Sequence, residues 1–499
     1  MMSTFAGLSI TMRGMYSSQA STMVTTNNMS NTNSEGYSRQ KVKQVSAGTA
    51  VVVSGKAIIG GGAEVVSVER VRDKALDSKY WLANSASGEW TLKSESLVEI
   101  QQVLGEPSNN GFSTVMNEFY AAMETLSDNA SDNAARADVM QSAKAVCAYL
   151  NDASTRLTEI RENLNTSVGT LVNQINSYAE QIANLNKQIR QASVVGASTN
   201  ELEDKRTLLI DELTKLTGIS VKETDDGMVN ISVNGDTLVN EGNARQLECY
   251  GMADGMYGIR WVGTGEAFEP ESGSIKGYLE LRDGDGSTGS GYKGVPYYIG
   301  QLDKFARTFA TAFNEGVYAD GNSYYAGHAG GYGYDGSTGI RFFTYDDCSS
   351  TDFMASGADL DARYANITAA NISVSKDVQD DVKKIATASA PGEVENNENI
   401  DDLIALCEDP LLFNRGTPED FMNSILSTLG TGGSFAQRAS DNKSLAVKNL
   451  DERRTSVSGV STDEETANLI KYQQAYDSAA SLVSVWNEIY ETTINMVNS

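Results

Sequence analysis

Residues 458–499 read SGVSTDEETANLIKYQQAYDSAASLVSVWNEIYETTINMVNS. Apolar and aromatic residues recur along this stretch at three-four spacing, which predicts one long coiled-coil helix. Its seam consists of Leu469, Tyr472, Tyr476, Ala479, Val483, Trp486, Tyr490 and Val497. A second apolar stripe on a neighbouring face consists of Ala475, Leu482, Ile489 and Met496. One partner helix covers only one of these stripes, so we expect the helix to have several neighbours.

The N-terminal segment provides the first candidate partner. Phe5, Leu8, Met12 and Met15 follow helical spacing, and the segment 4–29 as a whole is rich in Ser, Thr and Asn. These polar residues compete with a helix for backbone hydrogen bonds, so we expect the segment to fold only against a partner. Residues 27–40, NNMSNTNSEGYSRQ, then end the helix and turn the chain.

The next part of the chain is expected to be a hairpin-like extended segment, residues 41–72, followed by helices to Gly218. The strongest helical period in the protein consists of Leu164, Val168, Leu171, Ile175, Tyr178, Ile182, Leu185 and Ile189. Residues 200–218 supply a return helix after a short connection. Short connections between long helices predict an antiparallel rod.

The period changes from helical to alternating at Ile219. Asp226-Gly227 and Asn234-Gly235 are separated by alternating residues, and such dipeptides are typical of β-hairpin turns. We expect β structure to continue to about Leu281. Helix is expected again at 301–316 and 399–457, on either side of a Gly- and Tyr-rich region.

This order predicts a multidomain α+β protein. The terminal helices pair as a coiled coil, an elongated antiparallel helical rod follows, and central β-rich domains are inserted between helical segments. The expected domains are a terminal coiled-coil assembly domain (1–36 with 463–499), a helical rod domain (37–218 with 296–316 and 398–462), a β-rich domain (219–295) and a mixed Gly/Tyr-rich outer segment (317–397). Both termini should lie at one end of an elongated molecule.

Composition limits the possible partners. The formal charge of −27 makes nucleic acid and anionic membranes unfavourable partners. The chain has no apolar run long enough to cross a membrane, and its N-terminus does not resemble the usual secretory signal peptide. The four cysteines are scattered, and we expect them to be small buried hydrophobes, with a disulfide as the open alternative.

No catalytic, cofactor or metal site emerges, so we predict a protein that is not an enzyme. His328 is the only histidine and lies in a Gly-rich region without a fixed partner. Metal sites built from His and Cys clusters lack their ligands. Asp463, Glu464 and Glu465 open the last helix, where we interpret them as charges that suit the helix dipole.

Two terminal motifs resemble known ones. NNMSNTNSEGYSRQ resembles the N-terminal motif of flagellar rod, hook and hook-associated proteins, with matches at Asn27, Asn28, Asn31, Gly36, Tyr37, Arg39 and Gln40. Residues 458–480 are similar to the C-terminal motif of the same proteins, with matches at Ser458, Gly459, Val460, Asp463, Glu464, Glu465, Asn468, Leu469, Gln473 and Tyr476. Internal blocks at 200–221, 229–239, 274–283 and 297–316 resemble the flagellar hook-associated protein 1 family, the first hook–filament junction proteins. Four cysteines are unusual for that family.

The resemblance implies a structural protein without enzymatic activity or cofactors. It implies an extracellular location at the hook–filament junction of the bacterial flagellum, after transit through the cytoplasm. The implied partners are other copies in a ring, the hook protein on one side, the second junction protein on the other, an export chaperone on the C-terminal helix, and the flagellar type III export apparatus.

We expect the subunit interface to combine motif residues with the apolar seam. Its predicted members are Phe5, Leu8, Met12, Met15, Asn27, Asn28, Asn31, Gly36, Tyr37, Arg39, Leu469, Tyr472, Gln473, Tyr476, Leu482, Val483, Trp486, Ile489 and Tyr490. The predicted chaperone-binding residues are Leu482, Trp486, Ile489 and Met496. One alternative is another axial protein, such as the second junction protein or a hook subunit. Another is an enzyme or adhesin activity carried by residues 317–345.

Overall fold

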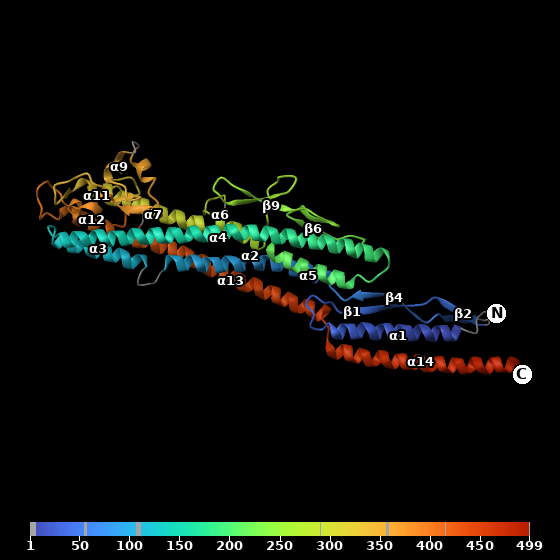
Figure 1. The fold of residues 1–499 in the computed structure, drawn as a ribbon. Helices are drawn as coiled ribbons and strands as arrows, with labels where there is room; N and C mark the ends of the chain where they lie inside the picture. The colour runs from blue at the N-terminus through green and yellow to red at the C-terminus, as the bar shows by residue number, and fades with distance from the viewer. Residues whose placement is uncertain are drawn as a thin grey trace.

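The computed structural model describes residues 6–53, 57–105, 111–289, 291–355, 359–414 and 416–498. The molecule is elongated, with both termini at one end and the segment coloured from yellow to orange, residues 317–408, at the other (Figure 1). This arrangement confirms the expected nested order, in which the middle of the chain lies farthest from its ends. From the termini outward, the molecule consists of a terminal unit, a helical rod with small strands on one side, and a head formed by the short elements of residues 317–408.

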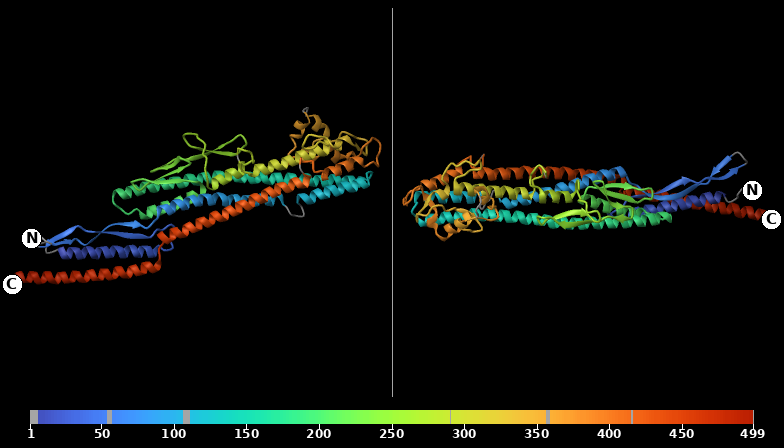
Figure 2. Two further views of the ribbon diagram at one scale, coloured as in Figure 1. Left: turned by 180° about the vertical axis from the view of Figure 1, so that it is seen from behind. Right: turned by 90° about the horizontal axis from the view of Figure 1, so that it is seen from above.

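The terminal unit has three layers (Figure 2). Its helices are α1 (Ala6–Ser30) and α14 (Thr462–Asn498). The predicted extended segment is a long antiparallel hairpin, in which β1 (Gln40–Ser46) pairs with β4 (Ala63–Arg70) and β2 (Thr49–Val53) with β3 (Ala57–Gly60). Helix α1 packs against both the hairpin and α14. Our sequence-based division places residues 37–70 in the rod, whereas this hairpin packs along α1 and touches the rod where Arg70 pairs with Glu203 and Asp204 of α5.

Long helices form the rod, as predicted. They are α2 (Lys74–Leu104), α3 (Phe112–Asp128), α4 (Asn133–Val194), α5 (Asn200–Leu216), α7 (Val295–Glu315) and α13 (Pro418–Ser458). Six of the eight seam positions on α4 are buried, and the other two, Tyr178 and Leu185, are half-buried. Helix α5 folds back on α4, and α13 runs along α2.

The small sheet covers one side of the rod. Strands β5 (Ser220–Glu223), β6 (Val229–Val233), β7 (Asp236–Asn240) and β8 (Asn243–Ala244) are antiparallel neighbours, and β9 (Leu247–Gly251) pairs with β10 (Tyr257–Trp261). Asn234 and Gly235 have φ values of 48° and 91°, which confirms the predicted tight turn. The four-stranded sheet packs toward α4 through Ile231 and Val239, and the separate β9–β10 pair does so through Trp261.

The expectation of β structure up to Leu281 is wrong. Residues Ser274–Asp283 form helix α6, which contacts α2 and α4. Ile275, Tyr278 and Arg282 follow three-four spacing, and Ile275 and Arg282 are fully buried. Packing against two rod helices therefore decides the structure of this segment, and the alternation of the sheet ends before it.

The end of the molecule opposite the termini is a mixed segment of short elements. They are α8 (Gly327–Gly330), β11 (Tyr332–Gly333), β12 (Phe343–Tyr345), α9 (Ser350–Ala355), α10 (Leu360–Tyr364), β13 (Ile372–Val374), α11 (Lys376–Asp380), η1 (Val382–Lys384), β14 (Ala386–Ala388) and α12 (Glu398–Glu408). An aromatic cluster joins this head to the rod. Phe313 of α7 lies 5.8 Å from Phe119 of α3 and 5.2 Å from Phe342 of the head, between ring centroids.

His328 belongs to the core of this head. It is 1% exposed, its Nδ1 donates to the carbonyl of Ile340 at 2.8 Å, and its Nε2 accepts from the amide of Ala386 at 2.9 Å. Both ring nitrogens are therefore used by the backbone, and burial lowers the pKa of His328 to about 4. Its observed contacts are those of a neutral, structural histidine.

Three further features can be stated for the described residues. The four cysteines are free; Cys147 and Cys407 are buried, as expected, whereas Cys249 and Cys348 are only half-buried. Within the described ranges, no group of three or more His, Cys, Asp or Glu side chains is arranged to hold a metal ion. The helices in those ranges include none that is long and apolar enough to span a membrane.

The buried histidine predicts a pH effect on stability. An unfolded histidine titrates near 6.5 and His328 near 4, so between these values the unfolded chain binds the proton first and stability falls as the pH falls. Between about pH 7.5 and about pH 5.5 this amounts to about 1.4 kcal/mol. The urea midpoint of unfolding should fall as the pH is lowered over this range. The variant His328→Gln should lack the part of this fall that comes from protonation of His328 in the unfolded chain. An unaltered pH dependence in the variant would contradict the assignment.

Candidate assembly site

The two terminal motifs meet where α1 ends and α14 begins. We call this region the joint and define it as residues 27–40 together with 458–465. Residues more than 400 positions apart in the chain contact each other here. The chain passes from α13 to α14 at the joint and changes direction (Figure 1).

Asn28 is the centre of the joint and is 1% exposed. Its Nδ2 donates to the carbonyl of Gln40 at 2.9 Å and to Oε2 of Glu465 at 3.2 Å. Its Oδ1 accepts from the amide of Gln40 and from the hydroxyl of Tyr37, both at 2.9 Å. These four bonds use the full capacity of an asparagine amide, which explains the need for this residue type at this place.

Arg39 connects the turn after α1 to the start of α14. Its backbone amide donates to the carbonyl of Ser458 at 2.8 Å, and its guanidinium contacts Glu464 and Glu465, each at 2.8 Å. Glu465 is 1% exposed, so its carboxylate depends on these partners. Interpreting the acidic first turn as a helix-dipole effect is therefore incomplete, because two of its three carboxylates bind Arg39.

Local backbone geometry explains two glycines of the motifs. Gly36 has φ +74°, in the left-handed region that glycine adopts without strain. A Cβ at Gly459 would lie 2.4 Å from the carbonyl oxygen of Thr455, so a side chain would disturb the end of α13.

The Tyr37 hydroxyl, which donates to Asn28, stays protonated. Burial and the nearby carboxylates of Asp204, Glu201 and Glu465 raise its pKa to about 12.

A second set of charged residues ties the joint to the rod, and sequence reasoning missed it. Asp204 of α5 accepts from the amide of Ser38 at 3.0 Å and pairs with Arg70 at 2.9 Å. Arg454 of α13 bridges Asp77 at 3.0 Å and Asp211 at 2.8 Å. Burial raises the pKa of Asp211, and Arg454 opposes that shift. The available signal was the presence of charged residues, such as Asp204, within otherwise apolar helix faces.

The seam of α14 faces α1, and the second stripe faces solvent. All described seam side chains are half-buried. In contrast, Leu482 is 53% exposed, Ile489 is 45% exposed and Met496 is 72% exposed. The helices are antiparallel, because Asn28 contacts Glu465 at one end and Gly7 lies against the Trp486 indole at the other. One partner helix therefore covers one stripe, as expected.

The inward face of α1 differs from the predicted apolar one. Its buried residues are small and polar: Thr11, Ser17, Ser21, Thr25 and Asn28. The hydroxyls of Thr11 and Ser21 donate to carbonyls four residues earlier in the helix, each at 2.9 Å, so burial does not leave them unsatisfied. Leu8, Met12 and Met15 are half-buried beside this face, and Phe5 and the Val497 side chain lie outside the described residues.

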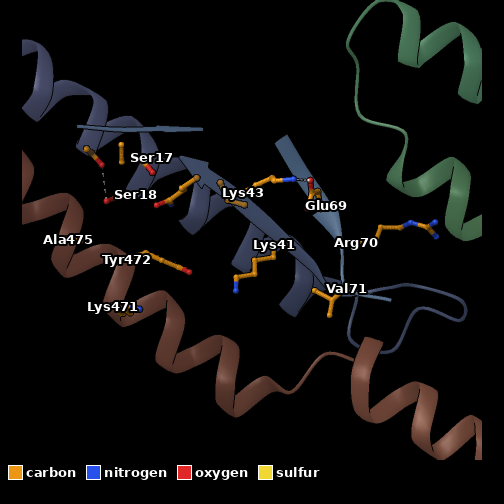
Figure 3. Close-up of a pocket in the computed structure, with 14 residues that line it drawn as sticks. Ser17, Ser18, Lys41, Lys43, Glu69, Arg70, Val71, Lys471, Tyr472 and Ala475 are labelled. Carbon is orange, nitrogen blue, oxygen red and sulfur yellow. Dashed lines mark hydrogen bonds and ion pairs between the residues drawn. The ribbon is translucent and has the colours of Figure 1, made fainter. Parts of the chain in front are cut away.

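Beside the helix pair lies a groove of about 860 Å³ (Figure 3). Gly14, Ser17 and Ser18 of α1 form its floor. Residues 41–44 of β1 form one wall, and Lys471, Tyr472 and Ala475 of α14 form the other. This groove lies on the side of α14 that carries the second stripe, since Ala475 belongs to both.

Apart from the α1 residues already placed, the predicted interface residues divide into three groups. Asn27, Asn28, Asn31, Gly36, Tyr37 and Arg39 belong to the joint. Leu469, Tyr472, Tyr476, Val483, Trp486 and Tyr490 are on the face of α14 toward α1. Gln473, Leu482 and Ile489 are exposed, as is Met496 of the predicted chaperone-binding set.

The chain is similar in sequence to known proteins. Residues 97–343 match the family model described as the flagellar hook-associated protein FlgK helical domain, and 453–496 match the C-terminal model of flagellar basal body rod FlgEFG proteins. Flagellar hook-associated protein 1 of Bacillus subtilis is 30% identical over 99% of both chains. The chain belongs to the flagellar hook-associated protein 1 family. The Salmonella typhimurium and Escherichia coli proteins of that name are each 27% identical over 97% of this chain and 98% of their own.

One solved structure also resembles this chain. The flagellar hook junction protein FlgK from Burkholderia pseudomallei is 24% identical, with a TM-score of 0.45 over 55% of this chain and 47% of that one. Family membership makes the chain a structural protein of the flagellum that associates with other axial components. The joint and the helix pair are therefore the regions to consider for assembly.

The joint predicts a specific weakness in the variant Arg39→Ala. Loss of the guanidinium leaves the buried Glu465 carboxylate without its cation and destabilises the helix pair by about 1–3 kcal/mol. Cleavage of α14 by a protease, in flagella isolated from cells carrying the variant, should then be roughly 5- to 150-fold faster.

The matched control is Lys43→Ala. Lys43 pairs with Glu69 on the hairpin, but both side chains are more than half exposed, at 55% and 54%, so its loss should leave the cleavage rate nearly unchanged. Equal cleavage rates for the two variants would contradict the role given to Arg39.

Proposed function

We propose that the chain forms the hook–filament junction, as a ring of copies between the hook protein and the second junction protein. The observation that carries this proposal is the uncovered stripe of α14. Leu482, Ile489 and Met496 stay exposed after α1 has covered the seam. Covering such side chains contributes about 1 kcal/mol or more each, so the stripe favours packing against other subunits.

We further propose that folding of the terminal helices is coupled to assembly. Helix α1 is poor in helix-forming residues, and its small polar face gains little from burial without α14 and the hairpin. In a free chain both terminal segments would then be disordered, which suits export in unfolded form through the type III apparatus. The ordering entropy is offset only in the assembled structure.

An export chaperone would have to act before the helix pair forms. The proposed chaperone-binding residues are Leu482, Trp486, Ile489 and Met496. Trp486 lies against Gly7 of α1, whereas the other three are exposed. A chaperone that contacts all four residues would therefore compete with α1 for the same helix.

The second candidate is another axial role, either the second junction protein or a hook subunit. The terminal motifs are common to all of these proteins, and the family assignment favours the junction. Imaging of flagella from cells that lack this chain separates the candidates. Hooks without filaments support the junction, and missing hooks contradict it.

Deletion of residues 460–499 tests the proposal directly. The truncated chain should keep its rod and sheet, because their cores lie outside α14. It should no longer join filament to hook. The measurements are helix content by circular dichroism and the fraction of hooks that carry filaments. A truncated chain that still joins the two would contradict the proposal.

A pair of substitutions separates assembly from general damage. Leu482→Asp with Ile489→Asp places charges on the exposed stripe and should prevent junction formation. Val194→Asp with Val195→Asp makes the same change at side chains that are 80% and 78% exposed on the rod, and it should have little effect. Equal effects of both pairs would remove the special role of the stripe.

A further inference from the structure

We infer that the groove beside α1 receives the acidic face of α14 from a second copy of this chain. The inference rests on the proposed assembly through the terminal helices and specifies which surfaces meet. It starts from the distribution of charge on the terminal unit, in which basic side chains from the hairpin and α14 line the groove, while carboxylates lie on the opposite side of α14.

The groove is lined by basic side chains, although the protein as a whole is strongly acidic. Four basic side chains line it: Lys41, Lys43, Arg70 and Lys471. Lys43 is paired with Glu69, and Arg70 is paired with Glu203 and Asp204. Lys41 and Lys471 are exposed on opposite walls, and neither forms an ion pair with any residue in the described ranges. Two ammonium groups without a carboxylate partner therefore line the same groove, with that of Lys471 also lying 5.9 Å from the centroid of the Tyr472 ring (Figure 3).

The opposite face of α14 is acidic. Lys471 is the only basic residue of this helix, and Asp477, Glu488 and Glu491 are exposed. At about 100° per residue, these three carboxylates lie roughly 140–160° around the helix from Ala475 in the groove wall. None of the three is in an ion pair with a described residue. The charge of the groove and the charge of this face are thus complementary, which favours a defined orientation between two copies.

The shape of the groove also suits a helix. Its floor is made of Gly14, Ser17 and Ser18, whose small side chains allow a second backbone to approach closely. Ala475 in the wall is followed at seven-residue spacing by the exposed Leu482 and Ile489. A helix that lies in the groove and continues along α14 would therefore cover the exposed stripe as well.

This contact is heterologous, because the groove and the acidic face are different surfaces of one copy. After two copies have joined, one keeps a free groove and the other keeps a free acidic face. Such contacts continue into a ring or a helical row and do not stop at a dimer. The inference thus accounts for a closed ring with one type of contact.

The test is a charge exchange in the full-length chain. Lys41→Glu with Lys471→Glu reverses the groove, and Asp477→Lys with Glu488→Lys reverses the helix face. Each pair alone should reduce the fraction of hooks with filaments roughly tenfold, because like charges then face each other. The chain with all four changes should restore that fraction to within about twofold, because complementarity returns.

Purified proteins provide a second readout that does not depend on the quadruple variant. Each double variant alone should associate less in sedimentation than the unaltered chain at the same concentration, whereas an equimolar mixture should associate as the unaltered chain does, because each groove then meets an opposite charge as the terminal helices order on assembly. Thermal unfolding confirms that the double variants are folded.

Two results would overturn the inference: double variants that form junctions normally, or charge reversals that neither the quadruple variant nor the mixture rescues. If either result appears while deletion of residues 460–499 still abolishes the junction, the proposed function stands and the groove contact alone is wrong.

Discussion

The ion pair between Arg39 and Glu465, with Asn28 beside it, determines how the terminal helices are placed. A buried carboxylate is tolerated only with its partners in position, so the turn after α1 and the start of α14 must come together. Asp204 attaches the turn after α1 to the rod, and Arg454 holds the end of α13 to α2 and α5. The register of α14 on α1 follows from the joint, and the register decides which stripe stays exposed.

This arrangement leaves part of α14 exposed, and we propose that this exposed surface is the one used in assembly. Small polar residues on α1 let the hairpin and α14 approach it from two sides, so α1 becomes the middle layer of the terminal unit. Helix α14 then has one face on α1, one face beside the groove, and one acidic face toward solvent. Within a single chain only the first of these faces is covered. We propose that other subunits cover the other two faces.

Much of this architecture could be predicted from periodicity. The α4 seam, the Asn234-Gly235 turn and the two stripes of α14 follow from local spacing, and the structure confirms them. Helix α6 was missed because the alternation of the preceding strands was extended into it, whereas its three-four spacing and its packing against two rod helices make it a helix. The ion pairs of the joint were missed because they join residues far apart in the chain, and residue spacing carries no information about such contacts. The small polar face of α1 was missed because apolar residues were taken as the signal for burial.

The central claim is that the stripe left exposed by α1 is the surface that other subunits cover. A map of the assembled hook–filament junction at side-chain resolution tests it most directly. The account predicts that Leu482, Ile489 and Met496 lie against a neighbouring subunit, while Leu469, Tyr472 and Tyr476 remain on the α1 of their own chain. A map in which the three exposed residues face open water, or in which α14 pairs with the α1 of another subunit, would contradict it.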